Sequence, residues 1–152
     1  MGIKEKYMGL SKKYKLPSFN EINEEFEISS IEKEDFLLRE IRRKIAEKLE
    51  LYMKFLEEIL QPETTLSNMY ESKIFDDEER TEIFKIYKKL MFFNRLSIET
   101  AVNEDDKKSS EYINAIFKEL DEIKERFSKF VAKAKESWLK DIDIKEELRY
   151  LG

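Results

Sequence analysis

The chain has 152 residues, of which 41% are charged and 41% hydrophobic, with a formal net charge of −5 and neither histidine nor cysteine. This length suits a single domain that buries about 70% of its unfolded surface, and the hydrophobic content excludes a disordered chain. The absence of His and Cys removes the side chains most used for nucleophilic, acid–base and tight metal chemistry, while three Gly and two Pro are too few for an all-β fold.

Residues 1–16 form a basic zone with one acidic residue, and we expect a mobile arm with one helical turn. Tyr7 and Tyr14 interleave with lysines, and aromatic side chains among basic residues can stack on unpaired bases. The arm is therefore a candidate nucleic-acid contact through Lys12, Lys13 and Lys15. The alternative is a basic terminus without such a role.

A short helix is predicted from Ser18 to Ile28, since Ser18 and Glu21 have capping-box spacing. The first long helix is predicted to begin at Ser29 and to end before Pro62, with Glu32 at the capping-box position. Its apolar residues recur in steps of three and four, as in a bundle seam. The stripe consists of Leu38, Ile41, Ile45, Leu49, Tyr52, Leu56 and Ile59.

An arginine cluster lies on this helix, and Arg39, Arg42 and Arg43 share one side of it. Guanidinium groups suit bidentate contacts with phosphate, so the cluster Arg39–Lys44 is a candidate site for phosphate or nucleic acid. The alternative is a solvated face paired with Glu40, Glu47 and the acidic helix of residues 18–28.

The segment from Pro62 to Phe75 is longer than a usual connection in a helical bundle. It contains Leu66, Met69 and Tyr70 among polar residues. It is predicted to hold a short packed helix that caps the bundle or to serve as an interaction loop.

The second long helix is predicted over Asp77–Val102, capped by Asp76 or Asp77. It is apolar over much of its circumference, so we expect a central helix with neighbours on two sides. Asn94, Arg95 and Glu99 interrupt this apolar run. They are candidates for a buried polar network beside a small-ligand pocket, and the alternative is a flank whose charged ends reach water.

The acidic residues do not fit the metal sites of two classes of helical protein. Glu78-Glu79-Arg80-Thr81-Glu82 has the Glu-Glu-x-x-Glu spacing of magnesium-binding helical nucleotide pyrophosphatases. The nearest second run has Val102 where Asp is needed, and it lies about 25 Å further along the same helix. A di-iron carboxylate site needs histidines, which the chain lacks. No catalytic residue, metal ligand or cofactor site is predicted.

The third long helix is predicted from about Asp105 to Leu139, followed by a short tail over residues 141–152 with Leu148, Tyr150 and Leu151 as docking residues. We therefore predict an all-α fold. It is an antiparallel bundle of three long helices with an extra short N-terminal helix, forming a single bundle over residues 17–140.

The sequence favours a non-catalytic protein-interaction or adaptor module with an unknown protein partner, and homodimerisation through Ile83–Val102 is an option. The alternative is a nucleic-acid- or ribosome-associated accessory protein that uses the basic arm and the Arg39–Lys44 cluster. A cytoplasmic location is expected because no signal peptide or membrane-length apolar run is evident. The Lys, Glu and Ile content is typical of thermophiles and of AT-rich genomes.

Overall fold

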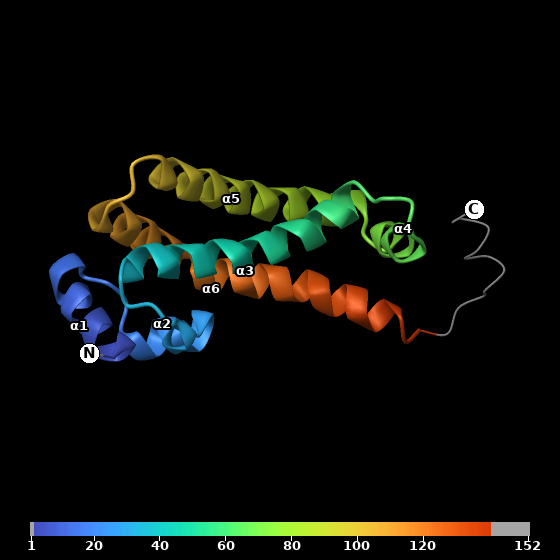
Figure 1. Ribbon diagram of the computed structural model, residues 1–152. Coiled ribbons are helices and arrows are strands. Elements are labelled where there is room, and N and C mark those ends of the chain that lie inside the picture. Colours follow the sequence, from blue (N-terminus) through green and yellow to red (C-terminus); the bar gives the residue numbers. More distant parts are fainter. Residues whose placement is uncertain (1, 141–152) are drawn as a thin grey trace. The chain divides into compact units, whose positions relative to one another are not determined.

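The computed structural model describes residues 2–140 (Figure 1). These residues form six α-helices and one 3₁₀ turn, with no strand among them. The elements are α1 (Ile3–Tyr14), α2 (Phe19–Phe26), η1 (Ile28–Ser30), α3 (Leu37–Leu60), α4 (Leu66–Lys73), α5 (Asp77–Val102) and α6 (Asp106–Ser137). The prediction of an all-α, bundle-like protein is confirmed.

The N-terminal zone differs from its prediction. In place of a mobile arm with one helical turn, residues 3–14 form a 12-residue helix. Tyr7 is fully buried, and its hydroxyl donates to the Pro17 carbonyl. Asn114 of α6 donates its side-chain amide to the Tyr14 carbonyl at 3.2 Å. The aromatic residues that suggested base stacking thus include one that anchors α1.

The start of α3 is also corrected, because it begins at Leu37 rather than at Ser29. Ser18 caps α2 as predicted, accepting from the Glu21 amide at 3.2 Å. The Ser29 amide, however, donates to the Asn23 side chain at 2.8 Å, so Ser29 closes α2 rather than opening a new helix. Phe36 then has a left-handed backbone (φ 56°) immediately before α3.

Side-chain caps also begin α5, α6 and α4, and the cap of α5 by Asp76 was predicted. Asp76 accepts from the Glu79 amide at 2.8 Å, and Glu79 accepts from the Asp76 amide at 3.1 Å, which completes a reciprocal capping box. Asp105 accepts from the Lys108 amide at 2.7 Å at the start of α6. The long connection holds the short helix α4, which Thr65 caps.

The chain divides into two compact units, and the single bundle over residues 17–140 stays a prediction. Unit 1 comprises Met1–Leu51 and Leu90–Asp121, and unit 2 comprises Tyr52–Lys89 and Glu122–Gly152. Each unit therefore contains part of α3, part of α5 and part of α6. In unit 2, α5 and α6 run antiparallel, because Glu79 pairs with Lys133 whereas Lys89, further along α5, pairs with Glu122.

Each unit has a core built from the predicted stripes. Leu38, Ile41, Ile45 and Leu49 of α3 are buried in unit 1, and Leu56 and Ile59 are buried in unit 2. Along α6, Ile113, Ile116 and Leu120 are buried in unit 1, and Ile123 and Ala134 are buried in unit 2. The predicted docking residues Leu148, Tyr150 and Leu151 lie outside the described residues.

None of the helices in residues 2–140 combines the length and the apolar character that crossing a membrane would require.

Candidate functional sites

A buried arginine connects two helices and a loop of unit 1. Arg42 of α3 is only 4% exposed. Its guanidinium donates to the Ser97 hydroxyl at 2.7 Å and to the Ser97 carbonyl at 3.1 Å on α5. It also pairs with the carboxylate of Glu104, in the connection between α5 and α6. A buried charge is tolerated when it is paired and hydrogen-bonded in this way. The guanidinium of Arg42 therefore serves the packing of unit 1.

The other predicted phosphate-binding arginines are paired with carboxylates as well. Arg39 is partly exposed and pairs with Glu104 at 3.3 Å, while its guanidinium lies 4.3 Å from the centre of the Phe36 ring. Arg43 is exposed and pairs with Glu40 at 3.1 Å. The structure therefore brings Arg39 and Arg42 to one shared carboxylate, an arrangement that leaves little positive charge for an external phosphate.

Tyr112 of α6 lies in the same part of unit 1, packed edge-on against Phe93 at a centroid distance of 6.5 Å. It is 1% exposed, and its hydroxyl has no hydrogen-bond partner among the described residues. Burial raises the pKa of Tyr112 well above its ordinary value of about 10, and the nearby Arg42 guanidinium opposes this shift. The hydroxyl is therefore neutral at physiological pH.

The predicted polar network around Arg95 is not buried. Arg95 and Glu99 are exposed, and among residues 2–140 Arg95 donates only to the side-chain oxygen of its neighbour Asn94. A cavity of about 500 Å³ between α5 and α6 in unit 1 includes Glu99 and Tyr112 in its lining but not Arg95. The buried polar face of α5 is instead the one that carries Ser97 and Thr100. The exposure of Arg95 agrees with the alternative interpretation, a residue at the flank of the helix whose charged end reaches water.

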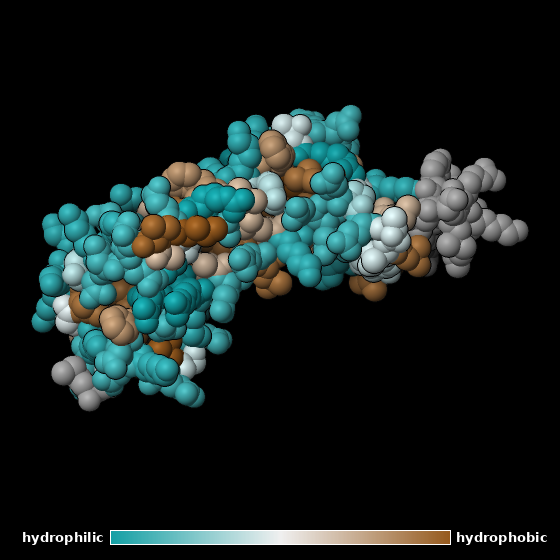
Figure 2. Space-filling model, turned by 45° about the horizontal axis from the view of Figure 1, so that its top comes forward, coloured by the Kyte–Doolittle hydropathy of each residue, from teal (hydrophilic) through white to brown (hydrophobic). Residues whose placement is uncertain are grey.

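The outer face of α5 in unit 1 is hydrophobic and exposed. Phe92 is 61% exposed, Ile98 53% and Val102 73%, and Arg95 and Glu99 lie among them. Figure 2 shows hydrophobic side chains reaching the surface between hydrophilic ones on the side turned to the viewer. The expectation that α5 has neighbours on two sides fits its buried side, where Ser97 contacts Arg42 of α3 and Phe93 packs on Tyr112 of α6. We call Phe92, Arg95, Ile98, Glu99 and Val102 the α5 outer face.

Helical spacing defines this face in the sequence, although it does not show that the face is exposed. Arg95, Ile98 and Val102 follow one another in steps of three and four, which places them on one side of α5. The buried residues Leu90, Phe93 and Ser97 form a separate stripe with the same spacing. The sequence could not say which of the two stripes faces the core.

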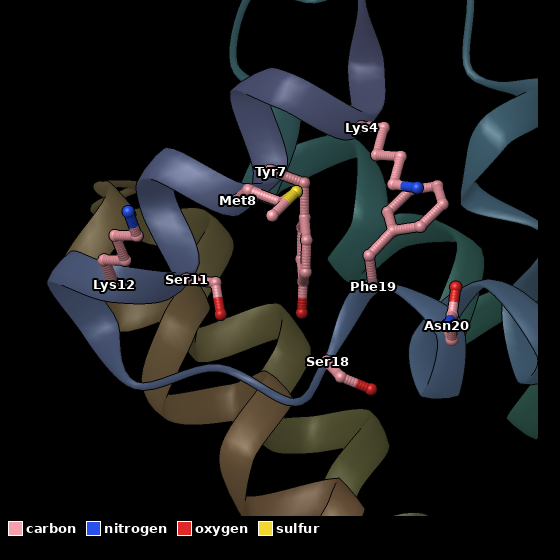
Figure 3. Close-up of a pocket in the computed structure, with 8 residues that line it drawn as sticks. All are labelled: Lys4, Tyr7, Met8, Ser11, Lys12, Ser18, Phe19 and Asn20. Atoms are coloured by element: carbon pink, nitrogen blue, oxygen red, sulfur yellow. The ribbon is translucent and has the colours of Figure 1, made fainter.

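A second candidate site is an open pocket of about 380 Å³ between α1 and α2 in unit 1 (Figure 3). The Lys4 ammonium lies 5.6 Å from the centre of the Phe19 ring at one end of the pocket. Met8 and Lys12 continue along α1. This arrangement combines positive charge with an aromatic ring, and of the predicted arm residues only Lys12 contributes to it.

The other two predicted arm lysines lie outside this pocket. The Lys13 ammonium lies 5.3 Å from the centre of the Tyr14 ring. Lys15 has a left-handed backbone (φ 54°) and ends α1 by donating its amide to the Ser11 carbonyl. The three lysines proposed as one nucleic-acid contact are therefore not brought together at one site.

The predicted interaction residues Leu66, Met69 and Tyr70 belong to α4 in unit 2. Tyr70 is 7% exposed, donates its hydroxyl to the Ser137 carbonyl at 2.8 Å and packs on Trp138 at a centroid distance of 4.4 Å. Met69 is half-buried, and Leu66 is 61% exposed. Tyr70 therefore attaches α4 to the end of α6, which leaves Leu66 as the exposed apolar residue of the three.

Among residues 2–140, no three acidic side chains gather closely enough to hold a metal ion. Comparisons with protein-family models, with curated proteins and with solved structures find no match to this chain.

Proposed function

We propose that this protein is a non-catalytic helical interaction module whose docking surface is the α5 outer face. The observation that carries the proposal is the exposure of Phe92, Ile98 and Val102 on one side of a single helix. Large exposed apolar groups at helical spacing typically bind another helix or a hydrophobic groove. The surrounding charges keep such a face soluble until its partner binds.

The firm packing of the helix that carries this face supports the proposal. The inner side of the same helical segment is held by the core residues Leu90 and Phe93 and by the hydrogen bonds from Arg42 to Ser97. A face on a well-packed helix loses little conformational entropy on binding, which favours affinity.

The test is a capture experiment with nuclease-treated extract of the source cell, read by mass spectrometry. The wild-type chain is compared with a Phe92→Ser/Val102→Ser variant and with a Leu51→Ser control. Leu51 is a matched control because it is 66% exposed in unit 1 but lies on α3. Proteins retained by the wild type and the control but lost by the double variant support the proposal. Equal capture by all three chains contradicts it.

A nucleic-acid-associated role is the second candidate, and the pocket between α1 and α2 is the observation that favours it. Lys4 and Lys12 supply positive charge, and the half-buried Phe19 ring supplies a surface on which a base could stack. Glu21 acts against this role, because its negative charge is close to Tyr7 in the pocket. Burial raises the pKa of Tyr7, and the Glu21 carboxylate raises it further.

This second candidate is tested with point variants, because deleting residues 1–16 would remove the buried Tyr7. Fluorescence anisotropy with a labelled single-stranded RNA is measured across a salt series for the wild type and for Lys4→Glu/Lys12→Glu. Lys54→Glu/Lys85→Glu is the control, with the same charge change at exposed lysines of unit 2. Binding that falls steeply with salt and is lost only in the α1 variant supports the role, whereas equal losses in both variants indicate nonspecific attraction.

A further inference from the structure

The α5 outer face carries opposite charges at positions that match under a twofold rotation. Arg95 and Glu99 are one helical turn apart, at about 6 Å along the axis, and both are exposed. Phe92 and Val102 lie outside this pair, at three residues from Arg95 and from Glu99 respectively. The order along the helix is therefore apolar, basic, acidic, apolar. When a second copy of this helix runs in the opposite direction, each basic residue lies opposite an acidic one and each apolar residue opposite an apolar one.

From this pattern we infer that the partner of the α5 outer face is a second copy of the same chain, bound with its α5 antiparallel. This inference rests on the proposed function and names its partner. When the partner helix runs in the opposite direction, Arg95 of each copy faces Glu99 of the other. In the same register, Phe92 of each copy faces Val102 of the other. One geometry thus satisfies both charges and buries the apolar residues on either side of them, which is the isologous contact expected of a twofold dimer.

The charges also exclude the neighbouring arrangements. A parallel pair in register sets Arg95 beside Arg95 and Glu99 beside Glu99. Sliding the antiparallel partner by one turn in one direction sets the two Arg95 side chains opposite each other, and sliding it in the other direction does the same for Glu99. Like charges in direct contact are unfavourable, so charge selects the register while the apolar residues supply contact area.

These side chains are free to make such contacts. Among the described residues, Arg95 bonds only to its neighbour Asn94, and Glu99 has no ion pair or hydrogen bond. In unit 2, by contrast, Lys85 and Lys89 of α5 pair with Glu82 and Glu122 of the same unit. The unpaired opposite charges coincide with the exposed apolar residues, which is the combination that a self-complementary interface requires.

The experiment measures the association of the full chain by sedimentation equilibrium over a concentration series. We expect the wild type to be in monomer–dimer equilibrium. Arg95→Glu and Glu99→Arg should each weaken association by on the order of ten-fold or more, since each sets like charges opposite each other twice in the dimer. The double variant Arg95→Glu/Glu99→Arg should recover an affinity within about three-fold of the wild type. Leu51→Ser should leave association unchanged.

The orientation is tested separately with thiols, because the natural chain contains no cysteine. Chains carrying Phe92→Cys and chains carrying Val102→Cys are mixed and treated with a short thiol-specific cross-linker. The antiparallel register predicts mixed products in preference to either symmetric product, because two Phe92 positions lie about 15 Å apart along the helix axis in this register.

The failure of this inference can be distinguished from the failure of the proposed function. A wild-type chain that stays monomeric, or an association that both single charge reversals leave unchanged, overturns the homodimer. If Phe92→Ser/Val102→Ser still abolishes capture of another protein in that case, the α5 outer face remains a docking surface for a different partner. If the double charge reversal is no tighter than the single variants, the Arg95–Glu99 register is wrong.

Discussion

Removing the acidic partner of the buried Arg42 should destabilise the protein more than removing the arginine itself. In Glu104→Gln, the guanidinium stays 4% exposed and keeps its hydrogen bonds to Ser97, but it loses its countercharge. Stranding a buried charge typically costs about 3–5 kcal/mol. Because the Glu104 side chain is 22% exposed and Gln can still accept one hydrogen bond, we expect a loss of about 2–4 kcal/mol.

The reverse substitution, Arg42→Met, leaves groups that can be satisfied in other ways. Glu104 keeps its pairing with Arg39 at 3.3 Å and its partial contact with water. The Ser97 carbonyl lies in the interior of α5, where it accepts the backbone hydrogen bond of the helix. Methionine fills much of the volume of the arginine stem, so we expect a loss of only about 1 kcal/mol.

The assay is urea unfolding followed by circular dichroism, with Arg43→Gln as the control. Arg43 is on the same helix but is 54% exposed and pairs only with Glu40, so its loss should stay within about 0.5 kcal/mol. The double variant Arg42→Met/Glu104→Gln should be more stable than Glu104→Gln alone, because it removes the stranded charge. If Arg42→Met costs more than Glu104→Gln, the reasoning from uncompensated charge is refuted.

Tyr112→Phe should be neutral or stabilise the protein by up to about 1 kcal/mol in the same assay, because it removes a buried hydroxyl without a partner; a larger loss would show that the hydroxyl is bonded, for example to a buried water. Burial raises the pKa of Tyr7 and of Tyr112, so both keep their protons more tightly in the folded state. Their contribution to the free energy of unfolding is fully present below pH 10 and is lost above it, by up to about 1.4 kcal/mol per pH unit for each tyrosine. Urea unfolding at pH 9, 10 and 11 should show this fall in stability, and the double variant Tyr7→Phe/Tyr112→Phe should reduce it. Asp76→Ala should cost about 1–2 kcal/mol by removing the cap of α5, whereas Asp77→Ala, which makes no cap bond, should cost less than about 0.5 kcal/mol in parallel urea titrations.

The caps and apolar stripes were predictable because both act locally. Ser18 caps the helix that its spacing to Glu21 indicated, Asp76 caps α5 as predicted, and Asp105 lies at the predicted start of α6. The burial of Leu38, Ile41 and Ile45 follows from steps of three and four residues. By contrast, Ser29 had the spacing of a capping box but bonds to Asn23, which lies before it in the chain. A forward-looking cap rule cannot detect that competing acceptor.

The candidate sites were less predictable because they depend on partners that are distant in sequence. For the Arg39–Lys44 cluster the sequence suggested only nearby partners such as Glu40 and Glu47, but its main acceptor, Glu104, comes more than 60 residues later in the chain. Arg95 was noticed as a charge in an apolar run, whereas the buried polar contact of α5 is made by Ser97, two residues away. Helical periodicity defines stripes, but only tertiary packing decides which stripe meets a neighbour.

The division of the chain into units has a consequence for synthesis and for proteolysis. Unit 1 is interrupted in sequence by residues 52–89, so it lacks essential segments of its core until Asp121 has been made. The apolar side of α3 therefore stays open to chaperones and to other chains while residues 61–121 are synthesised. A protease that cuts the connection between α3 and α4, or the one between α5 and α6, releases no intact unit. Each cut leaves two fragments that still share both cores, and we expect such nicked chains to stay together until a denaturant separates them.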